Sequence, residues 1–131
     1  MMPREVVDAL CRAMLGRTCK SAMLLHGYPW FDFGDGRTIR LQSRWRMGAL
    51  DGGKNLPSPP DVQGLVLTGL EIVGERSDLR LTWDDAIVLE TQPEGEDLQY
   101  ETWEAQVAPR RVAGGGPGTA WFSSLDTHEE D

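Results

Sequence analysis

The sequence predicts an α+β fold in which one N-terminal helix packs on an antiparallel sheet, or partly open barrel, of about seven strands. Apolar residues recur every three or four positions near the N-terminus and every second position through most of the remaining chain. A hairpin pattern that occurs twice predicts two repeated β-hairpin units. The length of 131 residues fits one domain, so we expect a single domain over residues 1–122 and a disordered acidic tail over residues 123–131.

The helix is predicted over residues 3–15. Pro3 suits a first helical position, and Gly16 follows as a C-cap. The residues at helical spacing are Val6, Val7, Leu10, Cys11 and Met14. They form one apolar stripe, and we expect it to face the core of the domain rather than a partner.

The first half then changes to period two. A strand over 18–25 is expected to pair with a hairpin made of strands 30–33 and 38–45, whose turn is Gly34-Asp35-Gly36. Apolar positions Ile39, Leu41 and Trp45 of the longer strand alternate with Arg40, Arg44 and Arg46. The three arginines are therefore expected to project from one strand face.

A loop rich in Gly, Pro, Ser and Asp is predicted over 48–64, and it divides the chain into two halves. The second half has predicted strands over 65–73, 79–83, 86–91 and 100–107, with Asp84-Asp85 as its hairpin turn. Residues 92–97 are predicted as a polar connection, 114–118 as a flexible segment and 120–122 as a last short strand.

The two hairpins align without a gap when the sequence is shifted by 50 residues. Phe33 matches Trp83, Asp35 matches Asp85, and Ile39 matches Leu89. Unrelated hairpins share such alternation through turn chemistry alone. The match of aromatic, Asp and aliphatic positions nevertheless favours duplication, with repeat one over about 15–47 and repeat two over about 65–107.

Over residues 15–122 the chain resembles a group of small, mostly actinobacterial proteins of unknown function, some related to immunity proteins of polymorphic toxin systems. The segments that carry the resemblance are 33–39, 44–46, 83–89, 100–103 and 114–121. Ala86 departs from the pattern, because Gly is expected there. The resemblance to immunity proteins implies a binding role, and no catalytic residue carries over from it.

Composition excludes several classes of protein. The net charge of −8 argues against a partner nucleic acid or an anionic membrane surface. Cys11, Cys19, His26 and His128 lack metal-ligand spacing, and the glycine run lacks the Lys and Ser/Thr of a phosphate loop, so we expect no metal and no cofactor. No signal peptide and no membrane-spanning run is evident, which makes a cytoplasmic location the expectation.

Charge is unevenly distributed along the chain. Residues 1–56 contain nine basic and five acidic residues, whereas residues 57–131 contain four basic and sixteen acidic residues. The candidate partner-binding residues in the second half are Asp84, Asp85, Glu94, Glu96, Asp97, Glu101 and Glu104. A dense acidic surface attracts a basic protein, although it can also serve solubility alone.

The arginines of the first half also have two interpretations. Arg40, Arg44 and Arg46 are candidate anion-binding residues, because guanidinium groups suit phosphate and carboxylate. The favoured alternative is that they pair across strands with acidic residues of the second half.

No catalytic constellation is evident. Asp35 and Asp85 are the only candidate carboxylate pair, and both occupy turn positions where Asp is common. The leading hypothesis is therefore a non-enzymatic immunity-type inhibitor that masks a basic protein partner. The alternatives are a small-ligand-binding or enzymatic β-barrel that uses the arginine-bearing strand, and a structural or self-assembling subunit.

Overall fold

The computed structural model describes residues 1–52 and 57–125, and this part of the chain forms one α-helix, two 3-10 helices and ten strands. The helices are α1 (Arg4–Met14), η1 (Pro59–Val62) and η2 (Gly95–Gln99). The strands are β1 (Ser21–Leu25), β2 (Tyr28–Gly34), β3 (Arg37–Leu41), β4 (Trp45–Ala49), β5 (Leu67–Val73), β6 (Asp78–Trp83), β7 (Ile87–Thr91), β8 (Trp103–Val107), β9 (Arg110–Gly114) and β10 (Phe122–Ser123).

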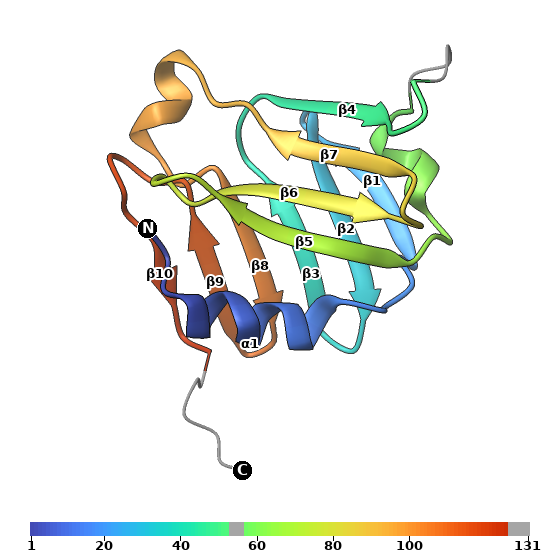
Figure 1. Cartoon of the computed structure of the whole chain (residues 1–131), viewed down its shortest axis with the longest axis horizontal. Coiled ribbons are helices and arrows are strands. Elements are labelled where there is room, and N and C mark those ends of the chain that lie inside the picture. The colour runs from blue at the N-terminus through green and yellow to red at the C-terminus, as the bar shows by residue number, and fades with distance from the viewer. Residues whose placement is uncertain (53–56, 126–131) are drawn as a thin grey trace.

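The strands form two antiparallel sheets rather than the single sheet or barrel that was predicted. The larger sheet has the order β1-β2-β3-β8-β9-β10, and the smaller sheet has the order β4-β7-β6-β5. In Figure 1 the strands of the smaller sheet run across those of the larger sheet, and α1 lies along the lower end, below β5. The predicted class, α+β with an N-terminal helix, is confirmed.

The helix packs as its apolar stripe predicts. Val6, Leu10 and Met14 are buried, and Leu10 and Met14 have no exposed surface. The thiol of Cys11 donates to the carbonyl oxygen of Leu70 on β5 at 3.5 Å. The stripe therefore faces the core of the domain.

Strands β1–β3 lie together in the larger sheet and strands β5–β7 in the smaller sheet, and the strand that follows each set belongs to the opposite sheet. β4 follows β3 along the chain but pairs with β7, and β8 follows β7 but pairs with β3. Between β3 and β4 the change of sheet takes place within three residues, where Gln42 donates its N–H to the carbonyl of Thr102 and the carbonyl of Arg44 accepts from the N–H of Gln92. The prediction of one continuous strand over 38–45 is therefore wrong.

The space between the sheets is filled by large apolar side chains. Trp83, Trp103 and Phe31 have no exposed surface, and Phe33 is 2% exposed. The rings of Phe31 and Trp83 lie 4.8 Å apart between centroids. A filled interior argues against the barrel alternative, which needs a ligand cavity between the strands.

The two hairpins have the same pairing in the region that the sequence aligned. Phe31 on β2 pairs with Ile39 on β3, and Leu81 on β6 pairs with Leu89 on β7. Each residue of the second pair lies 50 positions after its counterpart in the first pair, which is the shift that aligns the two hairpins in the sequence. The turn residues Asp35 and Asp85 have positive φ angles of 55° and 53°. The predicted hairpins and turns are thus present.

Two connecting segments differ from their predictions. The segment expected to be flexible contains the end of β9, and Gly114, Gly115 and Gly116 are buried. The 48–64 loop contains η1, which packs beside the outer edge of β1, and the side chain of Gln63 accepts from the N–H of Ala22 at 3.4 Å. Residues 53–56 of that loop and 126–131 of the predicted tail lie outside the described residues, whereas Ser123 ends β10.

Candidate binding surfaces

The three candidate anion-binding arginines each pair with an acidic residue of the second half. Arg40 lies 2.8 Å from Glu104, Arg44 lies 2.9 Å from Asp97, and Arg46 lies 2.9 Å from Glu90. Arg40 and Arg46 make the cross-strand pairs that the sequence favoured over an anion site, whereas Arg44 and Asp97 lie outside the strands. The net free energy from each pair is below about 1 kcal/mol, because the arginine ends are exposed.

The three arginines do not share one strand face. Arg40 belongs to β3 of the larger sheet, Arg46 belongs to β4 of the smaller sheet, and Arg44 lies in the connection between the two strands. The predicted common face is wrong because the chain changes sheets between Leu41 and Trp45. These guanidinium groups are therefore not aligned along one strand to bind a single anion.

The two sheets contain equivalent cross-strand ion pairs in which the basic and acidic positions are exchanged. On the larger sheet Arg40 of β3 faces Glu104 of β8, whereas on the smaller sheet Glu90 of β7 faces Arg46 of β4. Position 90 is the one that aligns with position 40 in the two hairpins. Part of the uneven charge along the sequence is therefore neutralised where the halves exchange strands.

The candidate partner-binding acids do not form one surface. Asp84 and Asp85 occupy the turn between β6 and β7, whereas Glu94, Glu96 and Asp97 lie at η2, beyond the other end of β7 (Figure 1). The expectation that these acids form one dense acidic surface is wrong, because β7 separates the two groups by its whole length.

Glu104 has a structural role on the larger sheet. Its side chain is only 11% exposed, and its two carboxylate oxygens bind Arg40 and Arg111, each at 2.8 Å. A carboxylate that is held by two guanidinium groups has little capacity left for a partner.

A projecting segment over residues 93–101, which we call the arm, presents apolar and acidic side chains together. Leu98 is 42% exposed and Tyr100 is 66% exposed. Glu94 and Glu96 are exposed and Glu101 is half-buried, and within the described chain none of their side chains takes part in an ion pair. Sequence reasoning missed Leu98 and Tyr100, because it assigned residues 92–97 to a polar connection and Tyr100 to the start of a strand.

Arg44 and Asp97 fix the shape of the arm. The guanidinium of Arg44 donates to the carboxylate of Asp97 and to the carbonyl of Glu94. The same carboxylate accepts from the N–H groups of Arg44 at 3.1 Å and Glu94 at 3.2 Å. Burial alone would raise the pKa of Asp97, but these N–H groups and the guanidinium outweigh burial and lower the pKa below its ordinary value.

Acidification should therefore weaken the arm's anchor. A carboxyl group whose pKa is lowered by folding stabilises the protein above its unfolded pKa of about 3.9, and this stabilisation is lost as the pH falls through the lower folded value. We expect Asp97→Asn to lower the free energy of unfolding by about 1–2 kcal/mol at neutral pH. The difference from the wild type should shrink in urea titrations at about pH 3.

Glu96→Gln is the matched control, because it removes an exposed charge of the same arm that has no ion pair in the described chain. Its unfolding free energy should equal that of the wild type at both pH values. An Asp97→Asn deficit that persists unchanged at low pH would show that Asp97 does not act through its charge.

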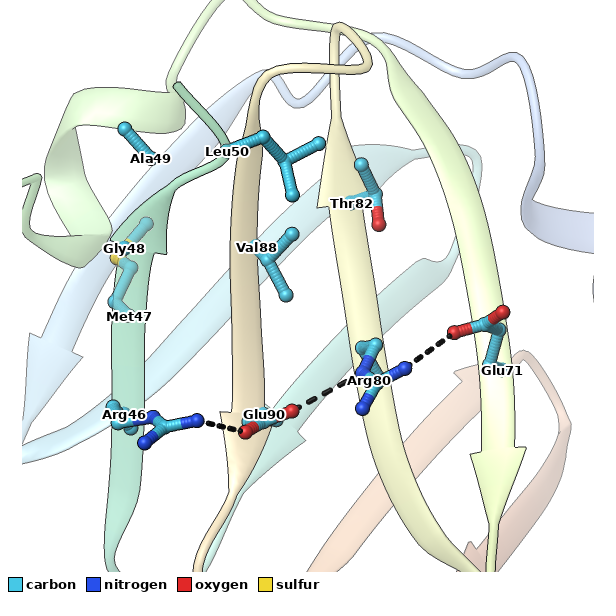
Figure 2. A pocket seen from close by; sticks show the side chains of 10 residues that line it. All are labelled: Arg46, Met47, Gly48, Ala49, Leu50, Glu71, Arg80, Thr82, Val88 and Glu90. Atoms are coloured by element: carbon cyan, nitrogen blue, oxygen red, sulfur yellow. Dashed lines mark hydrogen bonds and ion pairs between the residues drawn. The ribbon is translucent and has the colours of Figure 1, made fainter. Parts of the chain in front are cut away.

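The outer face of the smaller sheet carries a hollow of about 530 Å³. One side is a row of cross-strand ion pairs, Arg46–Glu90–Arg80–Glu71, at 2.9, 3.1 and 3.2 Å (Figure 2). The neighbouring row across the same four strands is Gly48, Val88, Thr82 and Gly69. Because both ends of this row are glycines, the sheet face is low there, and the side chain of Leu50, 62% exposed, borders it.

A second, smaller hollow lies beside the arm, with Arg76, Asp78, Thr91 and Leu98 in its lining. Arg76 donates from one end of its guanidinium to Gly115 at 2.7 Å and Gly118 at 3.3 Å, which ties the β5–β6 turn to the glycine-rich segment. Burial raises the pKa of Asp78, and the nearby Arg76 opposes that shift. The arrangement thus joins two connections at one end of the sandwich.

The arrangement offers no support for the paired-carboxylate site considered for catalysis. Asp35 lies in the β2–β3 turn and Asp85 in the β6–β7 turn, and Figure 1 shows these turns at separate corners of the molecule. Among the described residues no cluster of three or more His, Cys, Asp or Glu side chains is placed to hold a metal ion. Within the same residues, no helix has the length and apolar character needed to cross a membrane.

Comparisons of the chain with protein-family models, with curated proteins and with solved structures found no match. The geometry of the arm, the ion pairs and the outer sheet face is therefore the basis for any functional conclusion.

Proposed function

We propose that this chain is a non-enzymatic protein-binding domain that masks a basic partner with its arm, in the manner of an immunity-type inhibitor. The observation that carries the proposal is the arm itself. It projects two exposed apolar side chains, Leu98 and Tyr100, between carboxylates that have no ion-pair partner in the described chain. A surface that serves only solubility has no need of an exposed tyrosine and leucine in its centre.

The two kinds of side chain contribute differently to binding. Tyrosine is enriched among the residues that dominate interface energies, because it buries a large rigid area and still offers a hydroxyl. The carboxylates of Glu94, Glu96 and Glu101 would speed the encounter with a basic surface. Because Arg44 already holds the arm in shape, little conformational entropy is lost when the partner binds.

Two further parts of the proposal rest on the sequence. The resemblance to immunity-related proteins supports a toxin as the partner and the cytoplasm as the place of action. The alignment of the two hairpins, together with the equivalent pairs Phe31–Ile39 and Leu81–Leu89, supports an origin by duplication.

The test compares two variants of equal net charge. Glu96→Lys with Glu101→Lys reverses two acids at the arm, and Glu5→Lys with Asp8→Lys reverses two acids on α1, so that each double variant changes the net charge by the same amount. In affinity capture from the organism that encodes the chain, followed by mass spectrometry, the wild type and the α1 variant should retain a basic protein that the arm variant loses. Retention of the same protein by the arm variant would refute the proposal.

A further inference from the structure

The hollow on the outer face of the smaller sheet has the features of a ligand site that is separate from the arm. Its volume of about 530 Å³ falls within the usual range for small-molecule sites. The hollow exists because Gly48 has no side chain at a position where a Cβ atom would meet nothing within 4 Å. The apolar side chains that face it are Val88 and Leu50 (Figure 2).

Arg46 supplies unused hydrogen-bond donors at the border of this hollow. Its side chain is 74% exposed, more than those of Arg40 and Arg44. Its one carboxylate partner among residues 1–52 and 57–125, Glu90, is shared: one oxygen binds Arg80, and the other binds both Arg46 and the amide of Gln92. Within the described chain Arg46 donates from one nitrogen only, so most of its five N–H donors remain available.

The other arginine of the charged row, Arg80, has its guanidinium engaged by two carboxylates and does not offer a second anion site. Arg80 lies between Glu90 and Glu71 and donates to both, and these two hydrogen bonds raise the pKa of its guanidinium. Glu71 ends the row at β5, on the far side of the sheet from Arg46. The positive end of the row therefore lies at β4, next to Gly48.

We propose that this hollow binds a small amphipathic anion, a flat apolar group that carries one carboxylate or similar charge. The apolar body lies over Gly48 and Val88 beside Leu50, and the anionic group accepts hydrogen bonds from the free guanidinium nitrogens of Arg46. The hollow lies away from the arm and prefers an anion, whereas the acidic arm prefers a basic partner. The test of this ligand site is therefore independent of the proposed protein partner.

The probes for the test are 8-anilinonaphthalene-1-sulfonate, an amphipathic anion, and N-phenyl-1-naphthylamine, its uncharged analogue. Gly48→Ile fills the hollow from an open position on the sheet face, and Arg46→Gln removes the charge but keeps the length of the side chain. Arg40→Gln is the matched control, because Arg40 is an exposed arginine that also pairs with a glutamate, on the other sheet. Urea unfolding of each variant verifies that it is folded.

The wild type should enhance the fluorescence of both probes, and Gly48→Ile should abolish both signals. Arg46→Gln should weaken binding of the anion about two- to fivefold and leave binding of the neutral analogue unchanged. Arg40→Gln should change neither. The proposal is overturned if the folded Gly48→Ile variant binds the anion as the wild type does, or if Arg46→Gln and Arg40→Gln behave alike. It is also overturned if probe binding falls as the protein concentration rises, since a second copy of the chain would then occupy the hollow.

Discussion

Replacing Gly115 by alanine should lower the free energy of unfolding by roughly 3–5 kcal/mol, a large part of the stability of a domain of this size. Two causes act together. Gly115 has a φ of +68°, where a side chain is strained, and the added Cβ atom would collide with the hydroxyl oxygen of Thr102. Thr102 is itself 1% exposed and hydrogen-bonded to Gly114, so it has no room to move away.

Gly118→Ala separates these causes. Gly118 has nearly the same backbone conformation, with φ of +64°, but a Cβ atom there would meet nothing within 4 Å. The loss should be about 1 kcal/mol, which is the backbone strain alone. Urea unfolding followed by tryptophan fluorescence measures both variants. Equal losses would show that the packing of Gly115 against Thr102 does not constrain the fold.

Trp103→Phe should destabilise the protein more than Trp83→Phe, by about 1–2 kcal/mol. Both tryptophans have no exposed surface, so the two substitutions remove the same group from a buried site. The indole N–H of Trp103 donates to the carbonyl of Ser77 at 2.7 Å, whereas that of Trp83 is buried and has no partner among the described residues. Trp103→Phe therefore leaves a buried carbonyl unsatisfied, and Trp83→Phe removes an unsatisfied donor.

The comparison uses the midpoints and slopes of urea unfolding curves, because an unchanged slope shows that the two variants unfold to similar states. Each variant should also lose about 1–3 kcal/mol from the smaller buried volume. If Trp83→Phe proved the more destabilising of the two, the hydrogen bond to Ser77 would not be the deciding difference between these sites.

Alternation of apolar residues predicted most strands but not the sheets to which they belong. Leu41, Ser43 and Met47 are all buried, and Trp45 between them is half-buried. The period of two thus continues unbroken through the three residues that carry the chain from one sheet to the other. Because the buried side chains occupy every second position on both sides of the connection, the apolar pattern does not reveal that the chain changes sheets there.

The ordered glycine segment at the end of β9 was not predicted, for a different reason. Three consecutive glycines normally indicate a flexible segment. Here the indole of Trp103 and the carbonyl of Ser77 lie where a side chain at Gly114 would go, with both under 3 Å from its Cβ position. The glycines are required by close packing, and that packing depends on residues far away in the sequence.

The sequence predicted which charged residues pair, but it did not predict where the remaining acids lie on the surface. The pairing of Arg40 and Arg46 with acids of the second half follows from complementary charges on neighbouring strands, whereas Arg44 pairs with Asp97 between two connections. The division of the remaining acids between two ends of β7 depends on the direction of one strand, which the charge run does not encode. The uneven charge is thus partly internal to the fold, and Glu94, Glu96 and Glu101 of the arm are among the acids without an ion pair in the described residues.

We propose that the arm, and not the acidic sequence as a whole, forms the partner-binding surface. The affinity of the captured partner, measured by titration calorimetry at two salt concentrations for the wild type and the two charge-reversal variants, tests this proposal. The arm variant should bind at least about tenfold more weakly at low salt and lose most of its salt dependence, whereas the α1 variant should match the wild type. Equal weakening of both variants would contradict the claim, because binding would then depend on net charge alone.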